Sequence, residues 1–326
     1  MTSRFTLDHR LPPDHYQAGL RADVLRGLAE PPRTLSPKWF YDERGSELFE
    51  QITALPEYYL TRAEHEILTD HAAEIAAASG AATLVELGSG SSRKTRLLLD
   101  ALTAAGTVRR YVPVDVSGAA LVAAGEALCL EYPDLRVAAA VADFEQDLVL
   151  DAADPSPRML AFLGSTIGNF DPKQRQSLYA AFHRVLHDDD TLLLGADLVK
   201  DEAVLVPAYH DAMGITEAFN KNVLAVLNRD LDADFNPVDF DHHALWNADE
   251  ERIEMRLRSR HPQNVKIRAL DLVVDFAEDE ELRTEISCKF RRESLTAELE
   301  QGGFDVRHWW TDRAGRFALL LARPIG

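Results

Sequence analysis

Short apolar runs alternate with helical patterns in the middle of the chain, between about residues 82 and 198. In chain order the apolar runs are "ATLVELG", "RRYVPVDVS", "RVAAAVADF", "RMLAFLGSTI" and "TLLLGADL". Strands this apolar, separated by helices, are typical of a parallel sheet that is covered on both faces. We therefore expect an α/β domain built on such a sheet.

The predicted strands of this sheet end in small or acidic residues. These residues are Gly88, Asp115, Asp143, Gly164 and Asp197. In open α/β sheets, ligands bind outside the carboxyl ends of the strands. The five positions therefore mark one predicted ligand-binding edge.

The pattern changes in the second half of the chain. Residues 205–231 have helical character, and the runs "RIEMRLRSR", "VKIRALDLVVDF" and "RTEISCKF" that follow alternate apolar with polar residues. Such alternation suits an antiparallel sheet with one face in water. We predict a sheet domain that binds the cofactor, residues 61–198 plus 288–326, and an α+β substrate-recognition domain, residues 1–60 plus 199–287.

Composition narrows the class of partner. The 326 residues include 54 acidic and 35 basic residues, for a formal net charge of -19. The basic residues form no stripe that could follow a phosphate backbone. We therefore expect neither a nucleic acid nor an anionic membrane as a partner.

Cysteine and histidine usage bears on location and metals. Cys129 and Cys288 are the only cysteines and fit no disulfide or metal-binding pattern. The chain has neither a signal peptide pattern nor an apolar run of about 20 residues, so a cytoplasmic location is expected. The adjacent His242 and His243 lack the i, i+4 spacing of a helical metal pair, so no metal site is predicted.

A glycine-rich turn follows the first strand of the sheet, within "LVELGSGSSRKTRLL" at residues 84–98. It begins like the phosphate-binding motifs of nucleotide triphosphatases and dinucleotide oxidoreductases, but Arg93 stands where each motif requires a glycine. Both classes are therefore disfavoured. A ligand with a ribose and no phosphate, such as S-adenosylmethionine, fits better. Gly88 and Gly90 would let the backbone approach it, and Asp115 would accept bonds from both ribose hydroxyls.

Asp143 and Phe144 follow the third strand and suit an adenine base, the carboxylate by accepting from its amine and the ring by packing against it. Each residue also has a purely structural explanation. The glycines could only make a turn, Asp115 and Asp143 could cap helices, and Phe144 could belong to the core. Their order across one sheet is what favours S-adenosylmethionine.

Longer strings make the prediction more specific. They include "PKWFYDERGSELFEQITALPEYYLTRAE", "FLGSTIGNF", "FNKNVLAVLNRDLDADF" and "TEISCKF". Together with the glycine-rich stretch they closely resemble the histidine Nα-methyltransferase family of ergothioneine biosynthesis, in the same order over about residues 35–321. The resemblance implies a class I methyltransferase fold, a Rossmann-like sheet with a second domain. It also implies three methyl transfers from S-adenosylmethionine to the α-amino nitrogen of L-histidine, which give hercynine.

The resemblance also assigns site residues. The cofactor contacts that it implies are Tyr41, Gly88, Lys94, Asp115, Asp143 and Phe144. The substrate contacts that it implies are Tyr58, Asn169, Tyr209, Met255, Glu285 and Ser287. Of these residues, Tyr41 and Asn169 are the catalytic candidates.

These residue types suit an in-line methyl transfer, which needs positioning and desolvation rather than a metal or a covalent nucleophile. Asn169 can accept from the amine and donate to the carboxylate, to which Tyr209 can also donate. Tyr41 can orient the amine or pass its proton to water. Glu285 and Ser287, two residues apart on one strand face, can read the donor and the acceptor nitrogen of an imidazole.

The sequence leaves alternatives open. Without the resemblance, Glu285 and Ser287 would be interpreted as an exposed strand face. The same fold could methylate another amino acid such as tryptophan. A non-catalytic protein that binds an adenosyl ligand is a third possibility.

Overall fold

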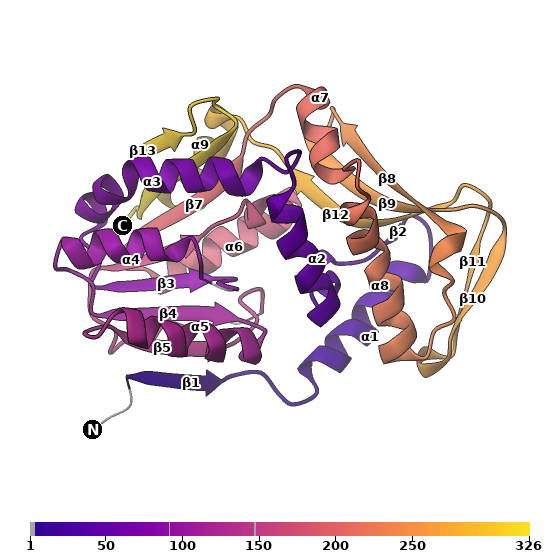
Figure 1. Ribbon diagram of the computed structural model, residues 1–326, viewed down its shortest axis with the longest axis horizontal. Helices are drawn as coiled ribbons and strands as arrows, with labels where there is room; N and C mark the ends of the chain where they lie inside the picture. The colour runs from indigo at the N-terminus through magenta and orange to yellow at the C-terminus, as the bar shows by residue number, and fades with distance from the viewer. Residues whose placement is uncertain (1–3, 91, 147) are drawn as a thin grey trace. The chain divides into compact units, whose positions relative to one another are not determined.

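A computed structural model describes residues 4–90, 92–146 and 148–326. The chain divides into two compact units, each made of segments that are distant in sequence (Figure 1). Unit 1 comprises Met1–Leu11, Leu60–Leu198 and Phe290–Gly326. Unit 2 comprises Pro12–Tyr59 and Val199–Lys289.

Unit 1 is built on an eight-stranded sheet in the order β1-β5-β4-β3-β6-β7-β14-β13. The first six strands in this order, β1 through β7, run parallel to one another. β14 is antiparallel to β7, and β13 is antiparallel to β14. In chain order these strands are β1 (Phe5–His9), β3 (Thr83–Leu87), β4 (Arg110–Asp115), β5 (Arg136–Val141), β6 (Arg158–Phe162), β7 (Thr191–Asp197), β13 (Phe304–Thr311) and β14 (Phe317–Pro324). Every residue of β3, β6 and β7 is buried, which explains their continuous apolar sequences.

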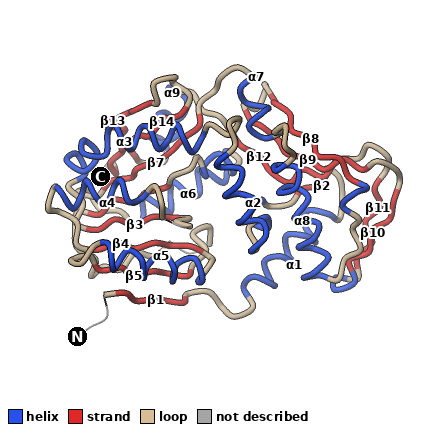
Figure 2. Tube along the Cα trace, in the orientation of Figure 1, coloured by secondary structure: helices blue, strands red, loops and turns tan. Residues whose placement is uncertain are grey.

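Helices flank this sheet on both sides. Figures 1 and 2 show α3, α4 and α5 in front of it and α6 behind it. The helical elements are α3 (Leu60–Ser79), α4 (Thr95–Ala104), α5 (Gly118–Glu131), η2 (Thr166–Asn169), α6 (Pro172–Val185) and α9 (Arg292–Gln301). The strand order reverses at β3, between β4 and β6, which is where open α/β sheets bind ligands. The expected Rossmann-like α/β fold is confirmed.

The first strand corrects one sequence-based assignment. Residues 1–60 were all placed in the substrate-recognition domain, but β1 pairs in parallel with β5 at the edge of the unit 1 sheet. Phe5 and Leu7 pack against the cluster that contains Leu121 of α5, and this apolar contact holds the segment on the sheet. The N-terminal part of unit 2 therefore begins only at Pro12.

Unit 2 combines helices with a four-stranded sheet in the order β2-β12-β9-β8 and a separate hairpin, β10-β11. Its strands are β2 (Arg33–Thr34), β8 (Phe240–Asn247), β9 (Arg252–Ser259), β10 (Gln263–Ile267), β11 (Leu272–Phe276) and β12 (Glu281–Cys288). Its helical elements are α1 (His15–Leu28), η1 (Pro37–Phe40), α2 (Glu43–Ala54), α7 (Glu202–Leu205), η3 (Val206–Tyr209), α8 (Ile215–Leu231), η4 (Pro237–Asp239) and η5 (Arg268–Leu270). Apart from the short parallel pair β2-β12, the sheet is antiparallel, as the alternating pattern predicts.

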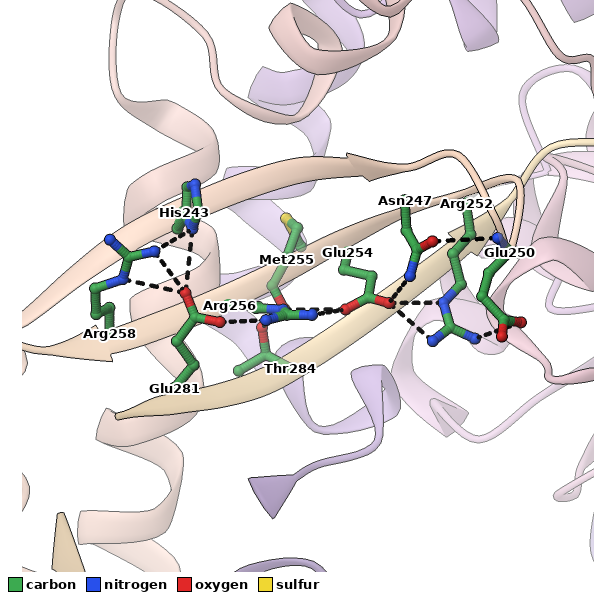
Figure 3. Close-up of polar contacts among 10 residues, drawn as sticks. All are labelled: His243, Asn247, Glu250, Arg252, Glu254, Met255, Arg256, Arg258, Glu281 and Thr284. Carbon is green, nitrogen blue, oxygen red and sulfur yellow. Dashed lines mark hydrogen bonds and ion pairs between the residues drawn. The ribbon is translucent and has the colours of Figure 1, made fainter. Parts of the chain in front are cut away.

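One face of the unit 2 sheet carries a ladder of charged side chains (Figure 3). Glu281 accepts from Arg258 at 2.8 Å and from Arg256, and Glu254 accepts from Arg256 and, at 2.8 Å, from Arg252. Although burial acts in the opposite direction, the bonds from Arg256 and Arg258 lower the pKa of Glu281 to about 2. This face therefore holds stable ion pairs rather than a titrating group.

A β-bulge in β12 changes which of its side chains lie on the charged face and which lie on the opposite face, which packs on α8. Glu281 and Arg283 pair with Arg258 and Arg256, but the register shifts after Arg283, so that Glu285 pairs with Met255 and Ser287 with Ile253. Side chains alternate between faces along a regular strand, and one extra residue reverses that alternation. The bulge thus places Glu285 and Ser287 on the Met255 face instead of the charged face.

Candidate active site

The glycine-rich turn of unit 1 follows β3. Gly88 and Gly90 have φ values of +65° and +48°, in the left-handed region that favours glycine. A Cβ placed on either would meet nothing within 4 Å, so the space beside the backbone is open. A ligand can therefore approach the turn closely.

Asp115 ends β4 and is tied to this turn. Its Oδ2 accepts from the Gly90 amide at 3.0 Å and its Oδ1 accepts from the Ser117 amide at 2.9 Å. Ser117, not Asp115, is the N-cap residue of α5, so the helix-capping explanation for Asp115 is wrong. A carboxylate fixed in this way retains lone pairs for two ribose hydroxyls.

Asp143 and Phe144 follow β5 on the same edge of the sheet. Asp143 is buried, and its Oδ1 accepts from the Glu145 amide at 3.0 Å. The half-buried ring of Phe144 packs edge-on against Phe162, with centroids 5.3 Å apart. Asp143 precedes a turn and begins no helix, so it also is not a helix cap.

Lys94 lies at the start of α4 and binds a carboxylate that the sequence analysis missed. Its Nζ is 2.5 Å from Oε2 of Glu64, a fully buried residue of α3. Oε1 of Glu64 accepts from the Gly164 amide at 2.6 Å. Lys94 is therefore held by an ion pair although its side chain is 33% exposed, and Glu64 links it to the carboxyl end of β6.

A second buried carboxylate lies beneath the turn. Glu86 of β3 accepts from the hydroxyls of Thr95, at 2.7 Å, and Tyr111, at 2.5 Å, and Tyr111 in turn contacts the Ser92 hydroxyl at 2.9 Å. Burial raises the pKa of Glu86 in spite of these bonds. The network fastens the turn to β4 and α4.

Asn169 is the last residue of η2, which follows β6. The preceding Ser165 has φ +57°, and its hydroxyl accepts from the Asp197 amide of β7 at 2.9 Å. The structure thus brings the predicted unit 1 residues together at one edge of the sheet. They are Gly88, Lys94, Asp115, Asp143, Phe144 and Asn169.

Unit 2 contains the other predicted residues, including Tyr41, which the resemblance assigns to the cofactor. The Tyr41 ring packs against Phe49 and Phe219, at centroid distances of 5.4 and 5.5 Å. The Tyr41 residue is 44% exposed, yet desolvation of its hydroxyl, followed by the nearby Glu285 and Tyr209, raises the pKa of that hydroxyl. The phenol is therefore neutral near pH 7 and suits an orienting role better than that of an ionised base.

Tyr58, Tyr209 and Ser287 lie close together. The rings of Tyr58 and Tyr209 are 6.4 Å apart, in an edge-on arrangement. The hydroxyl of Tyr209 is 2.8 Å from that of Ser287, and both side chains are buried. Lys289, which the sequence analysis also missed, donates to both hydroxyls at 2.8 Å.

Glu285 lies opposite Met255 on the α8 face of the sheet. Burial raises the pKa of its carboxyl to about 7, against the opposing effect of the Lys289 charge. Met255 is 2% exposed and provides an apolar neighbour. The interpretation of Glu285 and Ser287 as an exposed strand face is therefore wrong.

Unit 2 also has a cavity of about 420 Å³ beside η3. Its lining includes Glu57, His210, Asp211, Glu217 and His242. None of the predicted substrate residues lines it, so we do not assign it to the substrate. In the described ranges, no group of three or more His, Cys, Asp or Glu residues is arranged to hold a metal ion. Nor is any described helix long and apolar enough to cross a membrane.

Comparison with known proteins agrees with this geometry. Residues 20–324 match the family model described as histidine-specific methyltransferase, SAM-dependent. The histidine N-alpha-methyltransferase of Mycolicibacterium smegmatis is 53% identical over 317 residues, 97% of this chain and 98% of that protein. Ergothioneine biosynthesis protein 1 of Neurospora crassa is 37% identical over 204 residues, 60% of this chain and 23% of that protein. The L-tryptophan methyltransferase of Psilocybe serbica is 28% identical, over 93% of this chain and 92% of that protein.

A Rossmann-like sheet with a glycine turn and a carboxylate at the end of the next strand, together with these matches, defines an S-adenosylmethionine-dependent methyltransferase. The family match spans almost the whole chain. The chain belongs to the family of histidine-specific, S-adenosylmethionine-dependent methyltransferases.

We expect Lys94→Met to reduce both stability and cofactor affinity. The substitution leaves the Glu64 carboxylate buried without its cation, which should lower the free energy of unfolding by about 2 kcal/mol. This is less than for a fully buried pair because the Lys94 side chain is 33% exposed. Urea unfolding measures the stability, and calorimetric titration measures the affinity for S-adenosylmethionine.

The double variant Glu64→Gln/Lys94→Met serves as the control. It removes the unpaired charge and should recover part of the lost stability, while the cofactor affinity stays low if Lys94 contacts the ligand directly. An affinity that recovers together with stability would instead limit Lys94 to its bond with Glu64.

Proposed function

We propose that this enzyme transfers methyl groups from S-adenosylmethionine to the α-amino nitrogen of L-histidine, three times in succession, to give hercynine for ergothioneine biosynthesis. The observation that carries the choice of substrate is the pair of the half-buried Glu285 and the buried Ser287, which lie on β12 on the same face as Met255. A neutral imidazole has one N–H donor and one acceptor nitrogen, which complement a carboxylate and a hydroxyl.

The unit 1 residues bind the cofactor. Gly88 and Gly90 leave the space that the methionine and ribose portions need, and Asp115 binds the ribose hydroxyls. Asp143 and Phe144 bind the adenine, and Lys94 contributes a positive charge beside the turn. When bound, S-adenosylmethionine supplies a methyl group that its sulfonium already activates, so neither a metal nor a covalent nucleophile is needed.

The remaining residues bind and prepare the amino acid. Tyr209 donates to the α-carboxylate, and Asn169 accepts from the amine and donates to the same carboxylate. The amine must lose a proton before each of its attacks, and the neutral Tyr41 hydroxyl orients it and passes that proton to water. The faces of Tyr41 and Tyr58 tolerate the permanent cation that forms at the third transfer.

The same fold acting on tryptophan is the runner-up. An indole has one N–H donor and no acceptor nitrogen, so it could satisfy Glu285 but would leave the Ser287 hydroxyl without a nitrogen to bind. For this reason histidine fits the described side chains better.

Mass spectrometry of reactions with a panel of amino acids tests the proposal. Purified protein is incubated with S-adenosylmethionine and, separately, with histidine, tryptophan, phenylalanine and histamine. We expect histidine to gain one, two and then three methyl groups, and tryptophan to gain none at equal concentration. Absence of any methylated histidine would refute the proposal, and binding of S-adenosylmethionine without any product would favour a non-catalytic role.

A further inference from the structure

A buried ammonium lies between two of the proposed substrate residues. Lys289 follows β12 and is 3% exposed. Its Nζ donates to the hydroxyls of Tyr209 and Ser287, each at 2.8 Å, and lies 4.7 Å from the centre of the Tyr209 ring. The two hydroxyl oxygens are themselves 2.8 Å apart, so the three polar atoms form a triangle.

The number of hydrogen-bond donors in this triangle limits which bonds each hydroxyl can form. An ammonium only donates, so both oxygens accept from Lys289. One hydroxyl then donates to the other across their 2.8 Å contact. A ligand that offers an acceptor to each hydroxyl can replace that contact with two bonds. L-histidine offers two such acceptors, its α-carboxylate and its unprotonated ring nitrogen.

The same ammonium acts on Glu285. Burial raises the pKa of this carboxyl, and the Lys289 charge lowers it toward about 7. Among the described residues, the phenol of Tyr41, after η1, lies near Glu285, and the phenol of Tyr209, in η3, lies near Tyr41. Behind Tyr209, His242 of β8 contacts its backbone carbonyl, and burial lowers the pKa of His242 to about 4, so this imidazole is neutral near pH 7.

We propose that Lys289 is a positioning residue of the amino acid site, which makes Tyr209 a donor to the substrate carboxylate and Ser287 a donor to its ring nitrogen. Its charge also favours the ionised Glu285 that accepts from the ring N–H. This inference rests on the proposed function and deepens it. A purely structural lysine would need bonding partners, but those partners would not have to be the two hydroxyls that bind the substrate.

Three substitutions at this position separate charge from hydrogen bonding. Lys289→Met removes both, Lys289→Gln keeps donors without charge, and Lys289→Arg keeps both. Steady-state kinetics give KM for histidine and for S-adenosylmethionine, and the pH dependence of kcat/KM for histidine gives the ionisation that productive binding requires.

We expect Lys289→Met to raise KM for histidine by about 10- to 100-fold, because bonds to a charged group are lost at two hydroxyls, with KM for S-adenosylmethionine within about 2-fold of the wild type. Removal of the positive charge raises the pKa of Glu285, so the acidic limb of the profile should move to higher pH by about one unit. Lys289→Gln should show the same shift with a smaller increase in KM. Lys289→Arg should keep the wild-type limb.

Lys200→Met is the matched control. Lys200 also belongs to unit 2, donates to the Tyr59 hydroxyl at 2.7 Å and lies 4.6 Å from the centre of the Tyr59 ring. Its substitution removes the same kinds of contact from a different tyrosine. It should leave both KM for histidine and the acidic limb unchanged.

The outcomes are distinguishable. A Lys289→Met enzyme with the wild-type KM for histidine and an unmoved acidic limb would overturn the inference. If that variant is unfolded and does not bind S-adenosylmethionine, the test is a comparison of Lys289→Gln with Lys289→Arg. Acidic limbs at the same pH in these two variants would overturn the inference. A wild-type protein that does not methylate histidine refutes the proposed function, whereas unaffected variants of an active enzyme refute only the role of Lys289.

Discussion

Replacement of Asp115 by alanine should weaken S-adenosylmethionine binding by about 100-fold or more. The substitution removes a carboxylate that is proposed to accept from two ribose hydroxyls, and each bond to a charged acceptor contributes about 1.5–3 kcal/mol. It also frees the Gly90 amide, which donates to Asp115 at 3.0 Å and helps to fix the turn. Isothermal titration with S-adenosylmethionine measures the change directly.

Two further variants test whether the charge of Asp115 and its position cause this loss of affinity. Asp115→Asn keeps an oxygen that can accept from the Gly90 amide but removes the charge, so we expect an intermediate loss of about 10-fold. Asp151→Ala is the matched control, since the Asp151 side chain accepts from the Ala153 amide as Asp115 accepts from the Ser117 amide, and it should bind normally. Wild-type affinity in Asp115→Ala would mean that the ribose does not bind at this strand end.

Replacement of Glu285 by alanine should lower kcat/KM for histidine by about 100- to 1000-fold. A site built to bond a ring N–H loses this much when one of the partners is removed, because the other is left buried and unpaired. The discrimination against tryptophan should persist in part, because an indole N–H also loses its acceptor while Ser287 still favours a ring with an acceptor nitrogen. Competition between the two amino acids, followed by mass spectrometry, measures both effects.

The activity of the enzyme should depend on pH through the ionisation of Glu285. Burial raises the pKa of this carboxyl to about 7, so it is protonated below that pH and accepts from the ring N–H only above it. Activity of the wild type should therefore fall as pH decreases through about 7. Free histidine titrates near pH 6.5 as well. The variant Glu285→Gln distinguishes the two groups. It should lose the decrease in activity that comes from protonation of Glu285 and keep the decrease that comes from free histidine.

Glu281→Gln provides the control on the same strand. Glu281 lies on the charged face, bonded to Arg256 and Arg258, and is separated from Glu285 by the bulge. It should retain the wild-type KM for histidine. If Glu281→Gln and Glu285→Ala lowered kcat/KM equally, damage to the sheet, and not loss of a specific contact, would explain both.

The sequence predicts the unit 1 sheet well because its strands are buried on both faces and so have continuous apolar sequences. It fails for β1, whose five residues alternate apolar with polar and carry a weak local signal. Their place is set by pairing with β5, more than 120 residues later in the chain, and by the contact of Phe5 and Leu7 with α5. Such long-range contacts have no local pattern.

The candidate site also contains residues that the sequence predicts and residues that it does not. Acidic residues at strand ends are visible in the sequence, and so the unit 1 edge was predicted. Glu64 was missed, although its place on the apolar stripe of α3 with Ala63 and Ile67 is a usable signal. Lys289 was missed too, yet it continues the every-second-residue series of Glu285 and Ser287.

The bulge between Arg283 and Glu285 determines which side chains of β12 share the Met255 face. A point substitution in β12 changes one side chain and leaves its neighbours facing as before. Without the bulge, and at unchanged length, regular alternation from Arg283 would turn both Glu285 and Ser287 toward the charged ladder at once, whereas deletion of Thr284 would leave them opposite Met255 and Ile253. What Glu285 and Ser287 face therefore depends on the bulge as well as on the residues themselves.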